Sequence, residues 1–410
     1  MIFLGECMKN ILLVLGGLAI GGVETYVVRL SKYLSQSGCN VTVTLLSNKY
    51  DAGLFNELSN YATVNIVEHL PFFPASSWIN ALLPVPKDPV IYDVVHVVDV
   101  LTLAYVFLNK ARLKFTFLSI GIYHSMEISW WRGRNIYFRK KMLELYDKNV
   151  HLTLFPNERT AEMAAALSNV DVATLDVLPL GVSFESYSTR QPLQSSLRIV
   201  SIGRLVDFKV YNKHVIAQLS ELRKRANFEY FIYGAGPEHA ALISLAETCG
   251  VSDYVHFMGE VEYAELPSIF DGAFCFVGSG TTIIEASAAG IPSVVGIESI
   301  ELPLTCGLFS DVSGYSYNEV SATTVRVGIR ETIEMLHSMS PEGYSEVSDK
   351  HRQKAKSFDI VETSKRFVEL SNRTPVFDIS INRWVAMLSF VKSVILQGPK
   401  ALKSRFDSVG

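Results

Sequence analysis

Apolar and polar residues alternate along the first half of the chain in a pattern that predicts strands separated by helices. Short apolar runs of strand length are followed by longer segments in which apolar residues recur at helical spacing. The expected strands are residues 11–15, 40–46, 63–67, 94–98, 115–120, 152–155 and 176–180, and the expected helices are 23–36, 101–110, 136–146 and 157–166. Strands that are joined through helices form a mostly parallel sheet covered on both faces.

The same alternation starts again in the second half, after a polar stretch at 189–196 that is typical of a linker. Strands are expected at 197–202, 228–233, 254–257, 274–277 and 293–295, with helices at 214–225, 238–248 and 263–270. After about residue 322 the pattern favours helices, most clearly at 323–337 and 360–370. The prediction is an α/β protein with two doubly wound, Rossmann-like domains that face each other across a cleft.

The C-terminal tail differs from the rest of the chain. Residues 384–396 are strongly apolar, and the segment is flanked by cationic residues: Arg383, Lys392, Lys400, Lys403 and Arg405. It is too short to span a bilayer. Two interpretations stay open, a helix that lies on a membrane surface and a helix that packs across a domain surface.

Composition narrows the class of protein and its compartment. The 410 residues suffice for two domains, and a net charge of only -4 argues against nucleic acid as the main partner. The five cysteines lack CxxC spacing, which fits a reducing compartment, and no metal-ligand cluster is visible. No apolar run reaches transmembrane length. The expected location is the cytoplasm, with peripheral contact to the cytoplasmic face of a membrane left open.

The most informative stretch is AFCFVGSGTTIIEASAAGIPSVV at 273–295. It predicts a strand, a Gly-Ser-Gly turn, a helix and a second strand, so the turn lies at the carboxyl end of a strand, where open α/β sheets bind ligands. The first amides of the helix favour a phosphate. Glu285 shares a face with Thr281 and Thr282 and can accept hydrogen bonds from ligand hydroxyl groups. The alternative is a capping box in which Glu285 serves only its own helix.

Two more loops of the second half carry candidate chemistry. Arg204 and Lys209 follow a strand and can pair with a diphosphate, the arginine as a fork and the lysine as a point charge. Gly234 and Gly236, in the sequence YGAGP, follow the next strand and form a tight turn on the same edge of the sheet. An ordinary solvated loop is the alternative for the basic pair.

The first half contributes a glycine-rich loop and a histidine. Gly21 and Gly22, in GGLAIGGVE, let a ligand approach the backbone, but their spacing is not the GxGxxG of dinucleotide-binding proteins. His124 follows the strand expected at 115–120 and would face the cleft. The basic and aromatic segment WWRGR at 130–134 suits acidic headgroups or a diphosphate-linked acceptor, or else forms a solvated helix face.

Taken in order, these segments resemble the retaining, nucleotide-sugar-dependent glycosyltransferases of family 4 (glycosyl transferases group 1), which have the GT-B fold with two Rossmann-like domains. The resemblance extends over about residues 8–372. The matching segments are GGVETYVVRLSKYL, GIYH, LPLGV, GRLVDFK, YGAGP, VHFMGEV and IIEASAAGIPSVV.

The resemblance implies a role for each matching residue. Arg204 and Lys209 match the pair that binds the donor diphosphate and stabilises the leaving group, Glu285 matches the glutamate that holds the ribose, and His124 matches a histidine near the transferred sugar. The other donor-binding positions that it implies are Gly21, Gly22, Gly234, Gly236, Gly280, Thr281 and Thr282. No metal and no cofactor are needed in this family. The first glutamate of its E-x7-E motif, which contacts the donor sugar, falls on Val277 here, and Ser279 and Thr281 could replace it in part.

The implied organisation is an acceptor-side domain at 1–190, a nucleotide-sugar-binding domain at 191–356, and C-terminal helices at 357–410 that cross back to the first domain and end in a cationic amphipathic tail. The expected function is transfer of a sugar from a nucleotide-diphosphate donor to a glycan, lipid-linked, in cell-surface polysaccharide biosynthesis (O-antigen, capsule or exopolysaccharide). Two other classes stay open. One is a non-catalytic, glycosyltransferase-like partner subunit, and the other is a sugar-nucleotide epimerase on the same fold.

Overall fold

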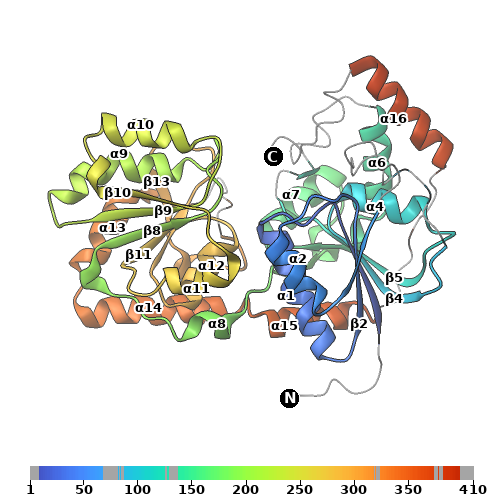
Figure 1. Ribbon diagram of the computed structural model, residues 1–410, viewed down its shortest axis with the longest axis horizontal. Helices are drawn as coiled ribbons and strands as arrows, with labels where there is room; N and C mark the ends of the chain where they lie inside the picture. Colours follow the sequence, from blue (N-terminus) through green and yellow to red (C-terminus); the bar gives the residue numbers. More distant parts are fainter. Residues whose placement is uncertain are drawn as a thin grey trace. The chain divides into compact units, whose positions relative to one another are not determined.

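The computed structural model describes residues 9–67, 82, 84, 87–124, 127–128, 137–317, 319, 324–373, 377 and 382–397. The chain forms two compact units (Figure 1). Unit 1 consists of Met1–Pro179 together with Thr363–Gly410, and unit 2 is Leu180–Glu362. Each unit contains one seven-stranded sheet with helices packed on it, which confirms the predicted α/β class with two Rossmann-like domains.

Unit 1 is built on a fully parallel sheet with the strand order β3-β2-β1-β4-β5-β6-β7. Its strands are β1 (Asn10–Leu15), β2 (Asn40–Leu45), β3 (Thr63–Ile66), β4 (Ile91–Val97), β5 (Lys114–Gly121), β6 (Thr153–Phe155) and β7 (Asp176–Val177). Its helices include α1 (Gly22–Gln36), α2 (Ala52–Ser59), α4 (Val100–Leu108), α6 (Tyr137–Lys148), α7 (Glu158–Ser168) and α16 (Arg383–Gln397), and α15 (Ile360–Leu370) lies almost wholly in this unit.

The apolar pattern explains the core of unit 1. Five of the six residues of the interior strand β1 are buried, as expected for a parallel strand with helices on both faces. Every residue of α4 is buried, which accounts for its nearly uniform apolar sequence. This helix begins after Asp99, whose carboxylate accepts from the backbone amide of Thr102 in a capping box.

Unit 2 has the strand order β10-β9-β8-β11-β12-β13-β14. Its strands are β8 (Arg198–Ile202), β9 (Glu229–Tyr233), β10 (Val255–Gly259), β11 (Cys275–Gly278), β12 (Ser293–Gly296), β13 (Leu304–Leu308) and β14 (Val327–Gly328). Its helices are α8 (Phe184–Ser188), α9 (Tyr211–Arg223), α10 (His239–Thr248), α11 (Leu266–Ile269), α12 (Thr281–Ala288), α13 (Ile329–Ser338) and α14 (Pro341–Lys356). The first five strands in this order are parallel, and β13 and β14 add antiparallel pairs at one edge.

Two expectations for this part of the chain were wrong, and one strand was missed. The helix predicted at 323–337 begins only at Ile329, because residues 327–328 form the strand β14. The strand β13 was not predicted. The stretch 189–196 is not a free linker, since Arg190 pairs with Asp271 at 2.7 Å and the side chain of Gln194 donates to the carbonyl of Met339 at 2.9 Å.

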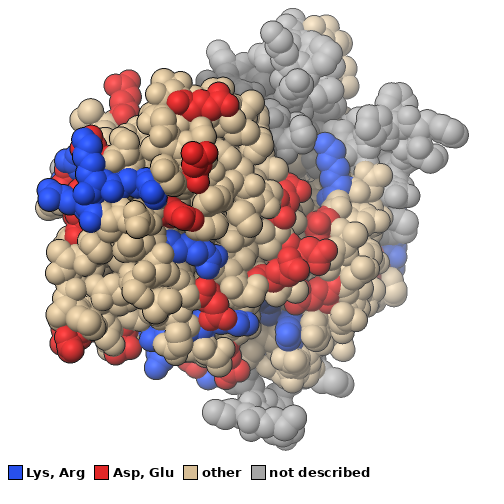
Figure 2. All heavy atoms as spheres, turned by 60° about the vertical axis from the view of Figure 1, so that its left-hand side comes forward, with Lys and Arg blue, Asp and Glu red and all other residues tan. Residues whose placement is uncertain are grey.

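Charged side chains of both signs are spread over the surface. On the face that Figure 2 shows, basic and acidic residues are interspersed. This mixture agrees with the small net charge of -4. Among the described residues, no helix has the length and apolar character that crossing a membrane requires.

Candidate functional site

Four loops of unit 2 meet at the carboxyl edge of its sheet. The strands β9, β8, β11 and β12 are neighbours and run parallel, so the segments that follow them lie side by side. The chain continues from β8 to β9 on one side, while β11 lies on the other side of β8. This arrangement is the topological switch point at which open α/β sheets bind ligands. All of the residues predicted for the donor site in the second half of the chain lie on these segments.

The loops after β8 and β9 are locked together through their backbones. The amide of Leu205 donates to the carbonyl of Ala235 at 2.9 Å. Gly234 and Gly236 have φ angles of 131° and 154°, which side chains rarely allow. A Cβ atom at Gly234 would collide with the carbonyl oxygen of Gly203, and one at Gly236 would collide with that of Leu205. These two glycines are therefore required by the packing of the two loops, and their role at the donor stays a prediction.

Gly234→Ala is expected to destabilise unit 2 by about 3–4 kcal/mol, because the new methyl group meets backbone that cannot move aside and the φ angle is strained as well. Gly250→Ala is the matched control, since Gly250 also has a positive φ, of 66°, but a Cβ atom there would have nothing within 4 Å. The control should lose only about 1 kcal/mol. Denaturant unfolding of both variants measures the difference, and equal losses would contradict the proposed collision.

The basic pair lies on the loop after β8. Arg204 is exposed and Lys209 is half-buried. The Nζ atom of Lys209 lies 3.1 Å from the position that a Cβ atom on Gly203 would take, so the ammonium group covers the end of the strand. None of the ion pairs formed among the described residues includes either cation. Two positive charges therefore stand at the switch point, where they favour an anionic ligand.

The N-terminus of α12 points its first amides to the same edge. Its N-cap is Gly280, with a φ of 74° and no side-chain cap. A Cβ atom on Gly280 would have nothing within 4 Å, so the turn leaves space beside the helix end. The hydroxyl of Thr282 contacts the carbonyl oxygens of Ile202 at 3.3 Å and of Ser279 at 3.2 Å, which fixes the helix start against the end of β8. A helix end of this kind suits a phosphate group.

Glu285 lies in the second turn of α12. The capping-box interpretation of this residue was wrong, because the helix starts at Thr281, its N-cap is Gly280, and no side chain caps it. The side chains of Glu285 and Thr281 are both buried. A carboxylate in so enclosed a position is expected to serve a specific partner rather than solvent. Its ribose-binding role stays a prediction.

The structure shows why Val277 cannot stand in for a sugar-binding glutamate, and it adds a residue that the sequence analysis missed. Val277 is a β11 residue whose side chain is fully buried in the core. The hydroxyl of Ser279 instead donates to the Oε1 atom of Glu298 at 3.0 Å. Glu298 follows β12, and the next amide, that of Ser299, donates to the carbonyl of Phe208 at 2.8 Å in the loop after β8. An acidic residue directly after the run SVVGI was the signal that could have identified it.

The predicted site residues of unit 1 lie at the carboxyl edge of its own sheet. Gly21 is the N-cap of α1, and a Cβ atom on it would collide with the carboxylate of Glu24, while Gly22 is the first residue of the helix. His124 follows β5 and is half-buried, and its carbonyl accepts from the amide of Glu127 at 3.0 Å. Only β4 separates β1 from β5. The roles of these residues stay predictions, and residues 130–134 of the basic and aromatic segment lie outside the described residues.

A buried polar cluster lies next to this edge and was not predicted. The Nδ1 atom of His96 is 2.9 Å from the hydroxyl of Ser119, and its Nε2 atom is 2.7 Å from the hydroxyl of Tyr123. Burial lowers the pKa of His96 to about 3. The pKa of Glu127 is raised well above its usual range, mainly by burial of its side chain and to a smaller extent by the negative charge of Asp99. The cluster therefore holds an uncharged imidazole at neutral pH.

Acid is expected to destabilise unit 1 through His96. Its pKa is about 3 in the folded protein and about 6.5 in the unfolded chain. Below pH 6.5 the unfolded chain therefore binds more protons, and the stability falls as the pH falls. Between pH 7 and 5.5 the loss should be about 1.3 kcal/mol, and His96→Gln should lack this part of it. Hydrogen exchange of the amides in β4 and β5 measures the change in stability of unit 1. The carboxyl groups of Glu127 and Asp99 have raised pKa values and favour the folded state as the pH falls, and the comparison with the variant removes their contribution. An unchanged pH dependence in the variant would contradict the assignment.

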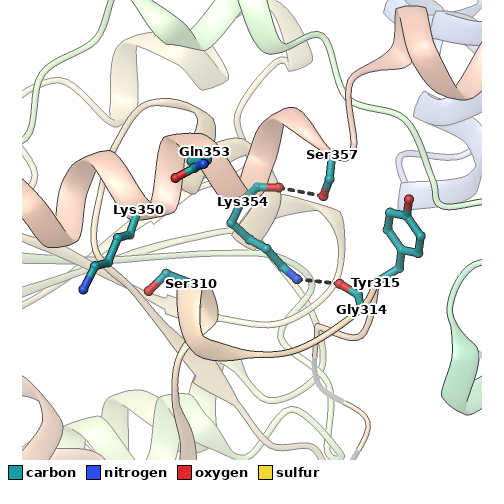
Figure 3. A pocket seen from close by; sticks show the side chains of 7 residues that line it. All are labelled: Ser310, Gly314, Tyr315, Lys350, Gln353, Lys354 and Ser357. Carbon is teal, nitrogen blue, oxygen red and sulfur yellow. Dashed lines mark hydrogen bonds between the residues drawn. The ribbon is translucent and has the colours of Figure 1, made fainter.

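A separate depression lies between α14 and the loop that follows β13 (Figure 3). The ammonium group of Lys354 donates there to the carbonyls of Val312 and Gly314. Because β13 runs antiparallel to β12, its last residue lies at the edge of the sheet where β12 begins. This depression is therefore at the edge opposite to the predicted donor site. Among the described residues no cluster of three or more His, Cys, Asp and Glu could hold a metal ion, and a metal-free reaction stays a prediction.

Comparison with known proteins finds a matching family for each half of the chain. The profile for Glycosyltransferase Family 4 matches residues 20–186, and that for Glycosyl transferases group 1 matches residues 188–299. Among solved structures, the Anabaena protein HepE in complex with UDP and glucose is similar in fold, with a TM-score of 0.62 at 12% identity over 88% of this chain and 98% of HepE.

Two curated relatives match part of the chain. A GDP-mannose-dependent phosphatidylinositol monomannoside mannosyltransferase of Mycobacterium tuberculosis is 28% identical over 46% of this chain and 54% of its own length. The alpha-monoglucosyldiacylglycerol synthase of Acholeplasma laidlawii is 24% identical over 39% of this chain and 45% of its own length. The chain spans about half the length of these relatives. With both profiles matched in order on a GT-B fold, the chain belongs to the GT-B glycosyltransferases of family 4 and group 1.

Proposed function

We propose that this protein is a retaining glycosyltransferase that moves a sugar from a nucleotide-diphosphate donor to a glycan acceptor. The observation that carries the proposal is the meeting of the basic pair Arg204 and Lys209, the N-terminus of α12 and the carboxylate of Glu285 on adjoining segments at the switch point of unit 2. Cations and helix amides suit a diphosphate, and a buried carboxylate suits the hydroxyl groups of a ribose.

In the proposed reaction the bond between the anomeric carbon and the β-phosphate oxygen breaks, and the acceptor oxygen forms its new bond to the same carbon. The proton of the acceptor hydroxyl passes to the departing phosphate oxygen, so no protein nucleophile is required. Arg204, Lys209 and the first amides of α12 stabilise the negative charge that grows on the leaving diphosphate. Attack on the face that the leaving group vacates retains the anomeric configuration.

The proposed acceptor is lipid-linked, in cell-surface polysaccharide assembly, and the protein would work in the cytoplasm or on the cytoplasmic face of the membrane. Both curated relatives support this class of acceptor, since their names specify a phosphatidylinositol mannoside and a diacylglycerol product. The cations that flank the apolar tail favour the same class.

Turnover of a nucleotide-sugar panel tests the proposal. UDP-glucose, UDP-galactose, UDP-N-acetylglucosamine and GDP-mannose are each incubated with the full chain, with and without lipid-linked glycan, and the released nucleoside diphosphate and product configuration are measured. The proposal expects acceptor-dependent release and a retained anomer. Nucleotide binding without turnover would identify a non-catalytic subunit, and an epimerised sugar nucleotide formed without acceptor would identify an epimerase.

Within this function, we propose that Glu298 replaces the missing sugar-binding glutamate. Its carboxylate accepts a hydrogen bond from Ser279, in the turn that leads into α12. The next residue, Ser299, donates its amide to the carbonyl of Phe208, in the loop that carries the basic pair. It therefore lies on the fourth segment of the switch-point edge, while Val277 is enclosed in the core. A carboxylate at this edge can accept hydrogen bonds from sugar hydroxyl groups.

Glu298→Gln is expected to weaken binding of the intact nucleotide sugar by about tenfold, the loss of one charge-assisted hydrogen bond. Binding of the free nucleoside diphosphate should stay within about twofold, because it has no sugar to contact. Glu301→Gln, at an exposed position of the same turn, is the matched control and should leave both affinities unchanged. Calorimetry with both ligands measures the effect, and an equal change in the two affinities would refute the assignment.

A further inference from the structure

One face of α16 presents large apolar side chains to solvent. Trp384, Leu388, Val391 and Ile395 are separated by four, three and four residues, so at 100° per residue they fall within one narrow stripe of the helix. Trp384 is 72% exposed, Leu388 68% and Ile395 76%. We call these four residues the α16 stripe. Single exposed apolar residues are common on proteins, but four along one helix face form a continuous patch that indicates a binding surface.

The opposite face of the helix is anchored in unit 1. Ala386 and Ser389 are buried, and Ala386 belongs to the hydrophobic core of the unit. The guanidinium group of Arg383 donates to the carbonyl of Leu108 and, at 2.9 Å, to the side chain of Asn109. The helix also packs against α6 and lies at the periphery of the unit, as Figure 1 shows. The helix is therefore held by one face, which leaves the stripe turned outward.

The charge of this part of the sequence favours one kind of occupant. Residues 384–406 contain the four cations Lys392, Lys400, Lys403 and Arg405 and no Asp or Glu, in a chain whose net charge is -4. Lys392 lies on α16 itself and is exposed. A second copy of this chain would bring the same cations against them, which repels. An anionic lipid surface attracts them, and its headgroup region accommodates tryptophan beside aliphatic side chains.

We infer that the α16 stripe is a docking surface for an anionic lipid bilayer, on which the helix lies parallel to the membrane plane. Its apolar side chains enter the headgroup boundary, and Lys392, on the same helix, contacts the lipid phosphates. The inference rests on the membrane association in the proposed function and assigns that association to one surface. It does not require turnover.

Vesicle flotation with the full chain tests the inference. The vesicles are phosphatidylcholine with or without phosphatidylglycerol, and the stripe variant carries Trp384→Ser, Leu388→Ser and Ile395→Ser. The control variant carries Met258→Ser, Leu302→Ser and Val325→Ser, which removes three exposed apolar side chains from unit 2 instead. Wild type and control should bind the anionic vesicles, and the stripe variant should bind at least about 30-fold more weakly. Thermal unfolding of the stripe variant should be unchanged, since all three positions face solvent.

The following results would overturn the inference. They are absence of wild-type binding to anionic vesicles, equal binding of the stripe variant, and a wild-type dimer in ultracentrifugation that the stripe substitutions dissociate. Equal binding to vesicles without phosphatidylglycerol would also contradict it, because the cations would then have no role. Calorimetry with UDP and GDP, done in parallel, separates this inference from the proposed function. If the chain binds vesicles through the stripe but binds neither nucleotide, the docking surface is supported and the transferase proposal is refuted.

Discussion

Replacing both Arg204 and Lys209 with alanine is expected to lower kcat/KM for the donor by about 10,000-fold, and either single substitution by about 100- to 1,000-fold. The reason is that the negative charge on the leaving diphosphate is largest in the transition state, where two cations at the end of β8 stabilise it most. The effect should therefore be mainly on kcat, with a smaller rise in KM. Steady-state kinetics with the donor found in the panel measures both parameters.

Lys224→Ala is the matched control for this prediction. Lys224 is an exposed lysine at the far end of α9, where it pairs with Glu221 at 2.7 Å, so its loss removes one positive charge from unit 2 without touching the switch point. Its kcat/KM should stay within about twofold of the wild type. If the control loses as much activity as Lys209→Ala, the effect comes from net charge and the assigned role of the basic pair is wrong.

Glu285→Gln is expected to weaken binding of the nucleoside diphosphate and of the intact nucleotide sugar alike, each by about 100-fold. The ribose is common to both ligands, and two hydrogen bonds to a buried carboxylate are worth about 3 kcal/mol together. This pattern contrasts with Glu298→Gln, for which only the nucleotide sugar should be affected. Calorimetry on the two variants therefore distinguishes a ribose contact from a sugar contact.

A structural role for Glu285 predicts a different outcome. Because its side chain is buried, the substitution could act on the packing of α12 and leave the ligand contact untouched. In that case the unfolding temperature of Glu285→Gln would fall while its nucleotide affinity stayed normal. Glu247→Gln, at an exposed position of α10, is the control and should change neither quantity.

Sequence reasoning succeeded for the elements whose pattern is set locally. The strands of both sheets that are buried on two faces read as apolar runs, and β1 and β11 were predicted within one or two residues. It failed where the local pattern is weak. The strand β13 contains Thr305 and Gly307 and gives no clear periodicity, whereas α14 lies in the region after about residue 322 that was expected to be helical. The strand β13 is held by its neighbour β12, since the hydroxyl of Thr305 donates to the carbonyl of Val295 at 2.7 Å.

For the candidate site, too, some features could be predicted from the sequence and others could not. Glycines, a basic pair and a glutamate at strand ends were visible in the sequence, because the carboxyl ends of parallel strands meet at one edge whatever the details of packing. The sequence alone therefore determined the fold class and the residues around the switch point. Only the tertiary structure showed that Val277 is enclosed in the core. It also showed that Ser279 is hydrogen-bonded to Glu298, which the sequence does not reveal because the two residues are 19 positions apart. It also decided which face of α16 packs on unit 1 and which faces outward, because a helical pattern with apolar residues on both sides does not specify which side is buried.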